Sequence, residues 1–397
     1  MEWKEVRLGD IVEIVNGFAF KSKAFTLDGI PVIKIKNIKA GKVILNDLDY
    51  ISTSDINPKY TKIRSSDILI TMTGNRMDGS PETWVGKVSL FRHQGDFYLN
   101  QRVSALRLID DSVDNNFLSY YLSSWQSQLY FALNSNSSGG QANITPAVVN
   151  EYRLTVPELE TQRCIASILS SLDRKIELNN KINADLEEMA QAIFKNWFVD
   201  FEPFKNGKFV DSELGMIPEG WNVGTLGDFC NVFTGKKNTN QAIEKGLYPF
   251  FSCAPEPLAS NDAIFNGKAI IIAGNGSYTG RTMFYNGGFD LYQRTYACTI
   301  REQDKENLMI FFYHMMKQFF EPVKMGGTRG SSIPYIVMGD ITQQKFPYSE
   351  ERLIRFSNIA NSMMDRKLRI DKEISRLSTL RDTLLPRLMS GEIEVPE

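Results

Sequence analysis

The chain contains the same arrangement of residues twice, and this internal repeat limits its fold more than any other feature. Four landmarks near the start return 218 positions later, namely Trp3, Leu8-Gly9-Asp10, Gly17 and Pro31 as Trp221, Leu226-Gly227-Asp228, Gly235 and Pro249. Further pairs follow in the same order at smaller offsets, namely Gly74-Asn75 with Gly274-Asn275, Gly86-Lys87 with Gly280-Arg281, Gln101-Arg102 with Gln293-Arg294, and Asp173-Arg174-Lys175 with Asp365-Arg366-Lys367. The 397 residues are therefore predicted to form two copies of one unit of about 200 residues.

The first three quarters of each copy are predicted to be a mixed α/β globule. Short apolar runs such as 31–35 and 269–272 are separated by Gly, Asn, Pro and Asp, a pattern typical of strands joined by loops. Two aromatic-rich stretches, 116–133 and 307–320, have roughly helical spacing and are predicted to be core helices. His314 lies in the second stretch, so we interpret it as a packed residue rather than a catalytic one.

The last quarter of each copy is predicted to be one long amphipathic helix. Apolar residues recur at helical spacing from Glu160 to about Phe198, and again from Glu350 to about Leu388. Nearly forty residues at 1.5 Å each make a helix roughly 60 Å long, more than one globule can cover. The apolar stripe is Ile165, Leu169, Leu172, Ile176, Ile182, Leu186, Met189 and Ile193 in the first helix, and Leu368, Ile374, Leu377, Leu380 and Leu384 in the second.

These two stripes are predicted to pack on each other as a coiled coil, with two independent surface helices as the alternative. If a two-fold axis relates the repeats and the globules lie at opposite ends, the two helices must be antiparallel. The expected fold is therefore α/β (mixed α+β), with two similar globules separated by two long antiparallel coiled-coil helices.

The composition is that of an ordinary folded protein with no strong bias in charge. Hydrophobic residues make up 42% and charged residues 23%, and 45 Lys and Arg oppose 47 Asp and Glu. Any basic surface must therefore be local. Four separated cysteines and two histidines make zinc sites and disulfide frameworks unexpected, and no signal peptide or membrane span is recognisable. We therefore expect a cytoplasmic protein.

Motifs for catalysis are incomplete throughout the sequence. Asn57-Pro58-Lys59-Tyr60 is close to the N-P-P-Y motif of amino-group methyltransferases, but Lys59 interrupts it and no Gly-rich cofactor turn precedes it. The stretch 274–282 has the glycines of a phosphate loop without its lysine or spacing. No other hydrolase, protease or metal motif is present, which predicts a chain without a catalytic centre of its own.

Residues suited to binding nucleic acid are more evident. The segment 34–42 carries Lys34, Lys36, Lys39 and Lys42 with no acidic residue between Asp28 and Asp47. Such a segment can neutralise phosphates, although a solvated strand face is an equal alternative. Polar loops follow apolar strands in each copy at 71–76 and 273–281, and similar loops lie at 135–143 and 326–332. Their Asn, Ser, Tyr and Arg side chains can read base edges.

The predicted DNA contacts are taken from these loops and their neighbours. In the first copy they are Lys34, Lys36, Asn37, Lys39, Thr73, Asn75, Arg76, Lys87, Gln101, Arg102 and Asn143. In the second copy they are Lys236, Lys237, Asn275, Ser277, Tyr278, Arg281, Gln293, Arg294, Thr328, Arg329 and Ser331.

With these features together, the sequence resembles the specificity subunits of type I restriction–modification systems. The resemblance rests on the Trp…Leu-Gly-Asp opening, the Gly-Asn loop, Asn100-Gln101-Arg102, and the helix ends 193–201 and 380–393. It covers essentially the whole chain. It implies target recognition domains at 1–155 and 201–347, and conserved spacer helices at 156–200 and 348–397.

The resemblance also implies function and partners. Each recognition domain would read one half of a bipartite DNA target, and the helices would set the gap and dock two methyltransferase subunits. Two restriction subunits would join optionally. Cofactors would lie in these partners, S-adenosylmethionine in the methyltransferase and ATP with Mg in the restriction subunit. The recognition domains vary within the family, so no residue-level DNA contact follows from the resemblance.

Alternative functions fit the sequence less well. A stand-alone methyltransferase or nuclease needs a cofactor site that the sequence does not contain. A coiled-coil scaffold that binds only proteins leaves the polar loops without a purpose. A specificity subunit that serves a fused methyltransferase-nuclease is a variant of the main hypothesis.

Overall fold

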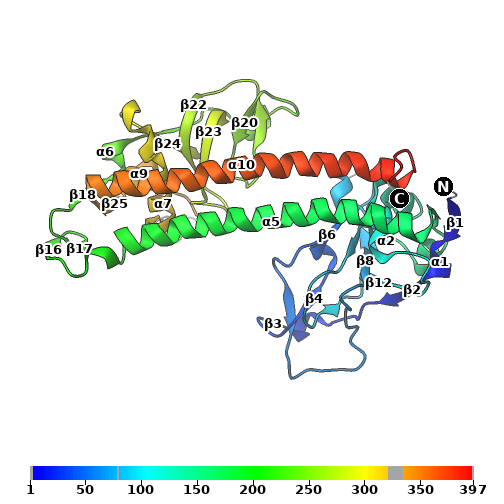
Figure 1. Ribbon diagram of the computed structural model, residues 1–397. Coiled ribbons are helices and arrows are strands. Elements are labelled where there is room, and N and C mark those ends of the chain that lie inside the picture. Colours follow the sequence, from blue (N-terminus) through cyan, green and yellow to red (C-terminus); the bar gives the residue numbers. More distant parts are fainter. Residues whose placement is uncertain (1–2, 78–79, 139, 321–333, 396–397) are drawn as a thin grey trace. The chain divides into compact units, whose positions relative to one another are not determined.

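The computed structural model describes residues 3–77, 80–138, 140–320 and 334–395. Packing divides the chain into two compact units (Figure 1). Unit 1 comprises Met1–Glu177 with Ile374–Glu397, and unit 2 comprises Leu178–Glu373. Each unit contains one globular part and one half of each long helix. The boundaries predicted at residues 155, 200 and 347 divide the chain by type of element instead, and they stay a prediction.

Unit 1 is built on a four-stranded antiparallel sheet in the order β10-β8-β12-β2. The central strand β8 (Ile68–Thr71) is apolar because both of its faces are covered. Ile68 and Ile70 pack in one cluster with helical residues, and Leu69 packs in another cluster on the opposite face. The neighbouring strands are β2 (Val12–Asn16), β10 (Val88–Leu90) and β12 (Val103–Leu108).

Smaller elements surround this sheet. A second sheet, β11-β4-β7-β3, consists of β3 (Phe25–Thr26), β4 (Ile30–Ile33), β7 (Asp49–Ile51) and β11 (Tyr98–Leu99). Short pairings involve β1 (Lys4–Arg7), β5 (Ile38–Lys39), β6 (Lys42–Val43), β9 (Thr73–Gly74), β13 (Asn136–Ser138), β14 (Gln141–Asn143) and β15 (Arg153–Val156). The helices of the globular part are α1 (Leu8–Ile11), α2 (Asn115–Ser123), α3 (Trp125–Leu133) and α4 (Pro146–Asn150).

Unit 2 contains a six-stranded sheet in the order β19-β24-β22-β23-β20-β21. The strands are β19 (Cys230–Thr234), β20 (Tyr248–Phe251), β21 (Leu258–Ser260), β22 (Phe265–Ala273), β23 (Thr282–Leu291) and β24 (Thr295–Ile300). The other strands, paired as β16–β17 and β18–β25, are β16 (Phe209–Ser212), β17 (Gly215–Pro218), β18 (Asn222–Thr225) and β25 (Lys345–Tyr348). Its helices are α6 (Leu226–Phe229), η6 (Gln303–Leu308), α7 (Met309–Phe319) and α9 (Met338–Thr342).

The sheets confirm the internal repeat. The order β2-β12-β8-β10 in unit 1 corresponds to β19-β24-β22-β23 in unit 2, and the β1–β15 pair corresponds to β18–β25. Strand β4 pairs in parallel with β11, as β20 does with the end of β23. The predicted mixed α/β fold with a duplicated unit is therefore confirmed.

Two local predictions need correction. The stretch 116–133 is two helices, α2 and α3, because Ser124 has an extended backbone and its side chain accepts a hydrogen bond from the Ser127 amide as the N-cap of α3. The loop predicted at 135–143 contains strands β13 and β14, and β14 pairs with β9. His314 is buried within α7, as predicted.

The two predicted long helices are confirmed as α5 (Leu159–Phe198) and α10 (Glu350–Met389), each 40 residues long. In each unit, half of α5 packs beside the opposite half of α10 (Figure 1). Asp173 contacts Arg381 in unit 1, whereas Asn183 contacts Asp371 and Glu187 contacts Lys367 in unit 2. Because later residues of α5 meet earlier residues of α10, the packing is antiparallel.

Three predicted seam residues are wrong. Met189, Leu368 and Leu380 are 53%, 41% and 44% exposed, so they lie outside the helix–helix seam. Ile165, Leu169 and Leu186 are buried, whereas the remaining predicted members are partly buried, namely Leu172, Ile176, Ile182, Ile193, Ile374, Leu377 and Leu384.

Polar and small side chains occupy seam positions at which apolar residues were expected. Alternating steps of three and four residues from Leu172 lead through Ile176 to Asn179, Asn183, Leu186 and Ala190, and the last four are buried. Each Asn amide donates to a carboxylate of α10, from Asn179 to Glu373 at 3.1 Å and from Asn183 to Asp371 at 2.6 Å. Met189 was predicted to lie in the seam because it is apolar, but it is one residue away from the seam position Ala190.

A tyrosine, a carboxylate and a cation join the globular part to the helix pair in each unit. In unit 1, Asp173 of α5 accepts hydrogen bonds from the Tyr120 hydroxyl of α2 at 2.6 Å and from the Arg381 guanidinium of α10 at 3.0 Å. In unit 2, Glu187 of α5 accepts from Tyr313 of α7 at 2.7 Å and from Lys367 of α10 at 3.0 Å.

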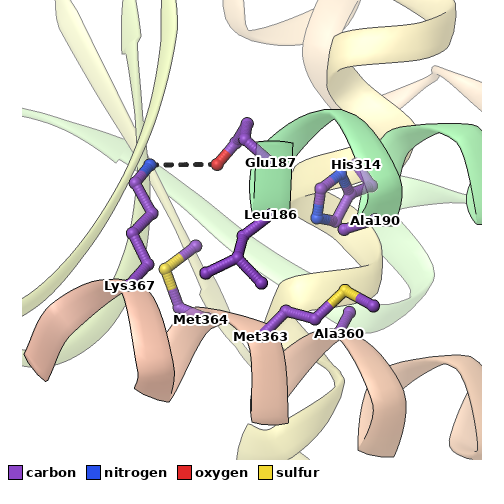
Figure 2. Close-up of a pocket in the computed structure, with 8 residues that line it drawn as sticks. All are labelled: Leu186, Glu187, Ala190, His314, Ala360, Met363, Met364 and Lys367. Atoms are coloured by element: carbon purple, nitrogen blue, oxygen red, sulfur yellow. Dashed lines mark hydrogen bonds and ion pairs between the residues drawn. The ribbon is translucent and has the colours of Figure 1, made fainter. Parts of the chain in front are cut away.

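The surroundings of Glu187 are shown in Figure 2. Leu186, Glu187 and Ala190 of α5 lie opposite Ala360, Met363, Met364 and Lys367 of α10, with His314 of α7 beside them (Figure 2). Burial alone raises the pKa of Glu187, but hydrogen bonds from Lys317, Tyr313 and Lys367 outweigh it and lower the pKa to about 2. Burial lowers the pKa of His314 to about 4. An ionised carboxylate and a neutral imidazole therefore lie at this junction near neutral pH.

Candidate nucleic-acid interface

Four predicted DNA-contact residues of the first copy meet in one polar pocket of unit 1, which we call the reading pocket. They are Thr73, Gln101, Arg102 and Asn143, and the pocket has a volume of about 470 Å³. Thr73 belongs to β9, Asn143 belongs to β14, and these strands pair directly at the two residues. Gln101 and Arg102 form the turn between β11 and β12, which is closed by a hydrogen bond from the Val103 amide to the Asn100 carbonyl. Strand ends distant in sequence thus present their side chains together.

Side chains in the reading pocket keep several donors and acceptors available. The Thr73 hydroxyl donates to Asn143 Oδ1 at 2.8 Å, which leaves the Asn143 amide nitrogen as a donor. Gln101 and Arg102 are exposed, and Arg102 Nη1 donates to Thr73 Oγ1 at 3.5 Å. Arginine commonly pairs with guanine, and asparagine or glutamine with adenine. The arrangement suits contacts to base edges.

The same turn has the same backbone support in unit 2. The Gly274 amide donates to the Arg294 carbonyl at 2.9 Å, as the Met72 amide donates to the Arg102 carbonyl at 2.9 Å in unit 1. Gly274 therefore corresponds to Met72 in the structure, which corrects its predicted pairing with Gly74 by two residues. Likewise the Gln293 amide donates to the Lys237 carbonyl, as the Gln101 amide donates to Phe18.

These turns explain the repeated glycine near the start of each copy. A Cβ on Gly17 would lie 2.1 Å from the Asn100 carbonyl oxygen, and a Cβ on Gly235 would lie 1.7 Å from the Leu291 carbonyl oxygen. Only glycine therefore allows the turn to approach this closely.

The basic segment 34–42 is partly neutralised by the fold. Lys34 pairs with Asp49 at 2.9 Å, and Lys36 pairs with Asp47 at 2.8 Å. The hydrogen bond with Asp47 raises the pKa of Lys36. Asp47 and Asp49 lie outside the segment in sequence, but the fold brings them beside its lysines. Lys34 and Lys36 are therefore less available to phosphates than predicted.

Asn37 and Lys87 have structural contacts that their prediction as DNA contacts did not include. Asn37 is buried, its Oδ1 accepts from the Lys34 amide, and its Nδ2 donates to the Ile44 carbonyl. The prediction that Asn37 reads a base is therefore corrected: its amide holds the turn. Lys87 is also buried and donates to the Glu82 carbonyl at 3.0 Å, outside the reading pocket. Asn75 and Arg76 are exposed beyond β9.

The predicted contacts of unit 2 are less concentrated. Ser277, Tyr278, Lys236 and Arg294 are exposed. The other four have intramolecular partners, namely Lys237 with Asp262 and Asp290, Asn275 with Cys253, Gln293 with Asn238, and Arg281 with the carbonyls of Ala254 and Pro255. Thr328, Arg329 and Ser331 lie outside the described residues.

Sequence reasoning missed three amide side chains that also line the reading pocket, Asn16, Asn136 and Gln141. Asn136 and Gln141 belong to the polar stretch 135–143, from which only Asn143 was predicted to contact DNA. Asn16 precedes the repeated Gly17, and its Oδ1 accepts from the Ser104 hydroxyl at 2.8 Å. Its position before a landmark glycine was the only available signal.

The described residues contain neither a cluster of metal ligands nor a helix suited to a membrane. In the described ranges, no group of three or more His, Cys, Asp or Glu side chains is arranged to hold a metal ion. None of the helices in those ranges combines the length and apolarity that a membrane span requires.

Comparison with known families decides the class of the protein. The family described as type I restriction modification DNA specificity domain matches residues 1–188 and 218–350, which include most of the chain and both copies of the repeat. The chain belongs to this family. It is accordingly a DNA specificity subunit of the type I restriction–modification class, a recognition subunit and not a catalytic one.

Named relatives agree with this assignment, and a solved structure shows the same fold. The specificity subunit is 26% identical to the type I restriction enzyme MjaIX specificity subunit of Methanocaldococcus jannaschii, over 100% of this chain and 94% of that protein. It is 33% identical to the EcoDI specificity subunit of Escherichia coli over 45% of this chain and 40% of that one. The crystal structure of the S subunit from M. genitalium has the same fold, with a TM-score of 0.61 at 17% identity, covering 98% of this chain and 96% of that chain.

Proposed function

We propose that each globular part of the specificity subunit reads one half of a bipartite DNA target. The observation that carries this proposal is the reading pocket, in which Thr73, Gln101, Arg102 and Asn143 converge from separate strands and turns. The internal repeat supports a second reader in unit 2, where the turn at Gln293-Arg294 has matching backbone hydrogen bonds. Two readers on one chain suit a target with two separate parts.

We further propose that α5 and α10 act as the spacer and as the docking surface for two methyltransferase subunits, with two restriction subunits joining optionally. Their exposed apolar side chains, which include Leu178 and Met189 on α5 and Ile354 on α10, support a protein partner. Cofactors would then lie in those partners, S-adenosylmethionine in the methyltransferase and ATP with Mg in the restriction subunit. The specificity subunit itself would need none.

The charge distribution supports weak DNA binding by the isolated chain. Residues 1–155 contain 17 basic and 16 acidic side chains, and residues 201–347 contain 14 of each. Lys34, Lys36 and Lys237 are paired with carboxylates of their own unit. Because phosphate contacts dominate affinity for DNA, the methyltransferase subunits would provide most of them.

The proposal is tested by determining the methylated motif in cells that carry the complete system. Replacing Gln101 and Arg102 with alanine should relax one half of the motif and leave the other half unchanged, because both residues belong to unit 1. Arg153→Ala is the matched control, since Arg153 is exposed in unit 1 and pairs with Glu5 away from the reading pocket. An unchanged motif in the Gln101/Arg102 variant would remove the reading pocket from the proposal.

A second measurement examines whether the two readers are separable. Residues 1–155 are exchanged for the matching segment of another family member. Only one half of the motif should change, because the second copy is left intact. Changes in both halves would mean that the two parts read DNA jointly.

A further inference from the structure

Unit 1 contains a second pocket, which shares no lining residue with the reading pocket. Its volume is about 450 Å³, within the range of roughly 300–1,000 Å³ typical of small-molecule sites. The side chains that line it include Lys39, Glu82, Lys87, Trp125 and Gln128, so we call it the lysine–tryptophan pocket. The Lys87 amide donates to Thr71 Oγ1 at 2.9 Å, and Thr71 lies two residues before Thr73 of the reading pocket.

Lys87 is a buried lysine whose ammonium group keeps donors for a ligand. Its side chain lies in the wall of the pocket, the residue is 5% exposed, and its ammonium group donates to the Glu82 carbonyl oxygen alone among the described residues. An ammonium group has three donors, so Lys87 can donate to a ligand in the pocket as well as to Glu82. An anion in the pocket would supply such acceptors.

Lys39 adds a second positive charge to the same wall. In the described ranges, its ammonium group forms no ion pair, in contrast to Lys34 and Lys36 of the same basic segment, which face Asp49 and Asp47. The hairpin that carries Lys39 is held in place by a hydrogen bond from the Gly41 amide to the Val88 carbonyl at 2.8 Å. Burial, followed by the nearby charge of Lys39, lowers the pKa of Lys87, and the charge of Glu82 acts in the opposite direction. Two lysines and one carboxylate line the pocket, so the excess of positive charge favours an anion.

An aromatic surface completes the pocket. Trp125 is 52% exposed, and its ring lies 5.4 Å from the ring of Trp84, which is buried behind it. Large exposed aromatic side chains on a rigid support are typical platforms for stacking a nucleobase. Trp125 is also the first residue of α3, where the helix dipole favours negative charge.

Two further lining residues limit the kind of base. The Gln128 amide nitrogen donates to the Pro81 carbonyl at 2.9 Å, which leaves its Oε1 as the atom available for a ligand. Glu82, when ionised, offers only acceptors. Acceptors alone favour a base with an exocyclic amino group, such as adenine or cytosine, over thymine.

We propose that the lysine–tryptophan pocket binds an unstacked nucleotide, with its phosphate on Lys39 and Lys87 and an amino-bearing base on Trp125. The proposal deepens the proposed reading of DNA and rests on it for its biological meaning. The nucleotide has two possible sources with the same chemistry, a free mononucleotide or a nucleotide displaced from a DNA strand. The site is separate from the reading pocket, so it would hold one strand while base edges are read nearby.

The test titrates the full-length chain with dAMP, deoxyadenosine and dTMP, and follows tryptophan fluorescence together with ligand-observed NMR. We expect dAMP to bind more tightly than dTMP, and deoxyadenosine to bind about tenfold more weakly than dAMP because it lacks the phosphate. Lys39→Ala should weaken dAMP binding about tenfold and leave deoxyadenosine unaffected. Trp125→Ala should weaken both ligands about tenfold, and Trp125→Phe should restore most of the affinity.

Lys42→Ala is the matched control, because Lys42 lies opposite Lys39 in the β5–β6 hairpin but does not line the pocket. Circular dichroism establishes that each variant is folded. A duplex with one unpaired adenine is titrated in parallel. One outcome would assign the nucleotide to DNA. In that outcome the duplex binds and dAMP does not, and duplex binding is weakened by Lys39→Ala and by Trp125→Ala but not by Lys42→Ala.

The proposal is overturned if neither dAMP nor the duplex with an unpaired adenine binds, or if binding is the same in wild type, Lys39→Ala and Trp125→Ala. Failure of the reading proposal has a different signature. In that case the Gln101/Arg102 variant leaves the methylated motif unchanged, whatever the mononucleotide titrations show.

Discussion

The substitution Glu187→Gln is expected to destabilise unit 2 by about 2 kcal/mol at pH 7. The Glu187 carboxylate accepts hydrogen bonds from Tyr313 at 2.7 Å, Lys317 at 2.8 Å and Lys367 at 3.0 Å. These partners lower its pKa from 4.5 to about 2, and a tenfold change in the ionisation equilibrium is worth about 1.36 kcal/mol. The lowering alone corresponds to about 3 kcal/mol, which solvent screening of the partly exposed lysines reduces to about 2.

The pH dependence has a definite sign. The folded-state pKa of Glu187 lies below its unfolded-state value, so the stabilisation is complete above about pH 4.5 and is lost as the pH falls toward about 2. Glutamine cannot ionise. The difference in unfolding free energy between wild type and Glu187→Gln should therefore shrink across this pH interval.

The measurement is urea unfolding of the full chain, with hydrogen exchange of α7 and the adjoining part of α5 to report on unit 2. Glu188→Gln is the matched control, because Glu188 is the next residue of α5, is exposed, and forms no ion pair within the described ranges. It should change the unfolding free energy by less than about 0.5 kcal/mol. Equal stability of the Glu187 and Glu188 variants at pH 7 would refute the reasoning, as would a difference from wild type that does not depend on pH.

Three other predictions follow from the helix pair and from the residue that packs beside it. Burial lowers the pKa of His314 from 6.5 to about 4, so the wild type should lose stability as the pH falls from about 6.5 to 4. In urea unfolding, His314→Gln should lose less stability over that range. Parallel curves of unfolding free energy against pH for the two proteins would contradict this. Asn183→Leu should raise the thermal midpoint in calorimetry, because an apolar side chain at a buried seam position stabilises the folded state more than an amide paired with an exposed carboxylate. The control Asn180→Leu should not raise the midpoint, because Asn180 is exposed. If the helices set the gap, inserting four residues after 179 and four after 371 should lengthen each helix by about 6 Å and add one or two base pairs to the gap of the methylated motif. Four residues nearly preserve the seam, whereas an insertion of two residues should inactivate the protein. An unchanged gap in an active four-residue variant would show that the helices are not the spacer.

Much of the fold was predictable because its strongest signals are local or self-similar. The 218-position repeat of Trp3 and Leu8-Gly9-Asp10 at Trp221 and Leu226-Gly227-Asp228 indicates two units without any knowledge of contacts. The apolar periodicity of 160–198 and 350–388 predicted two helices that the structure places at Leu159–Phe198 and Glu350–Met389. Hydrophobic spacing along one helix depends only on its 3.6-residue turn, which the chain itself provides.

Part of the candidate site was predictable for the same reason. Thr73 and Asn143 lie in predicted polar loops and Gln101-Arg102 is a repeated pair, and these signals are all local or self-similar. Sequence could not show that Asn16 joins them or that Lys87 lies in a different pocket. Those placements depend on which strands pair, such as β14 with β9.

The sequence by itself therefore determined the duplication, the two long helices and the types of residue offered to a ligand. Tertiary structure alone decided which of those residues are available. Lys34 and Lys36 remain charged but are paired with Asp49 and Asp47, which the fold brings close to them. The seam positions expected for apolar residues hold Asn179 and Asn183. The physical reason is that burial and electrostatic pairing depend on distances between atoms far apart in the chain, and local periodicity does not contain those distances.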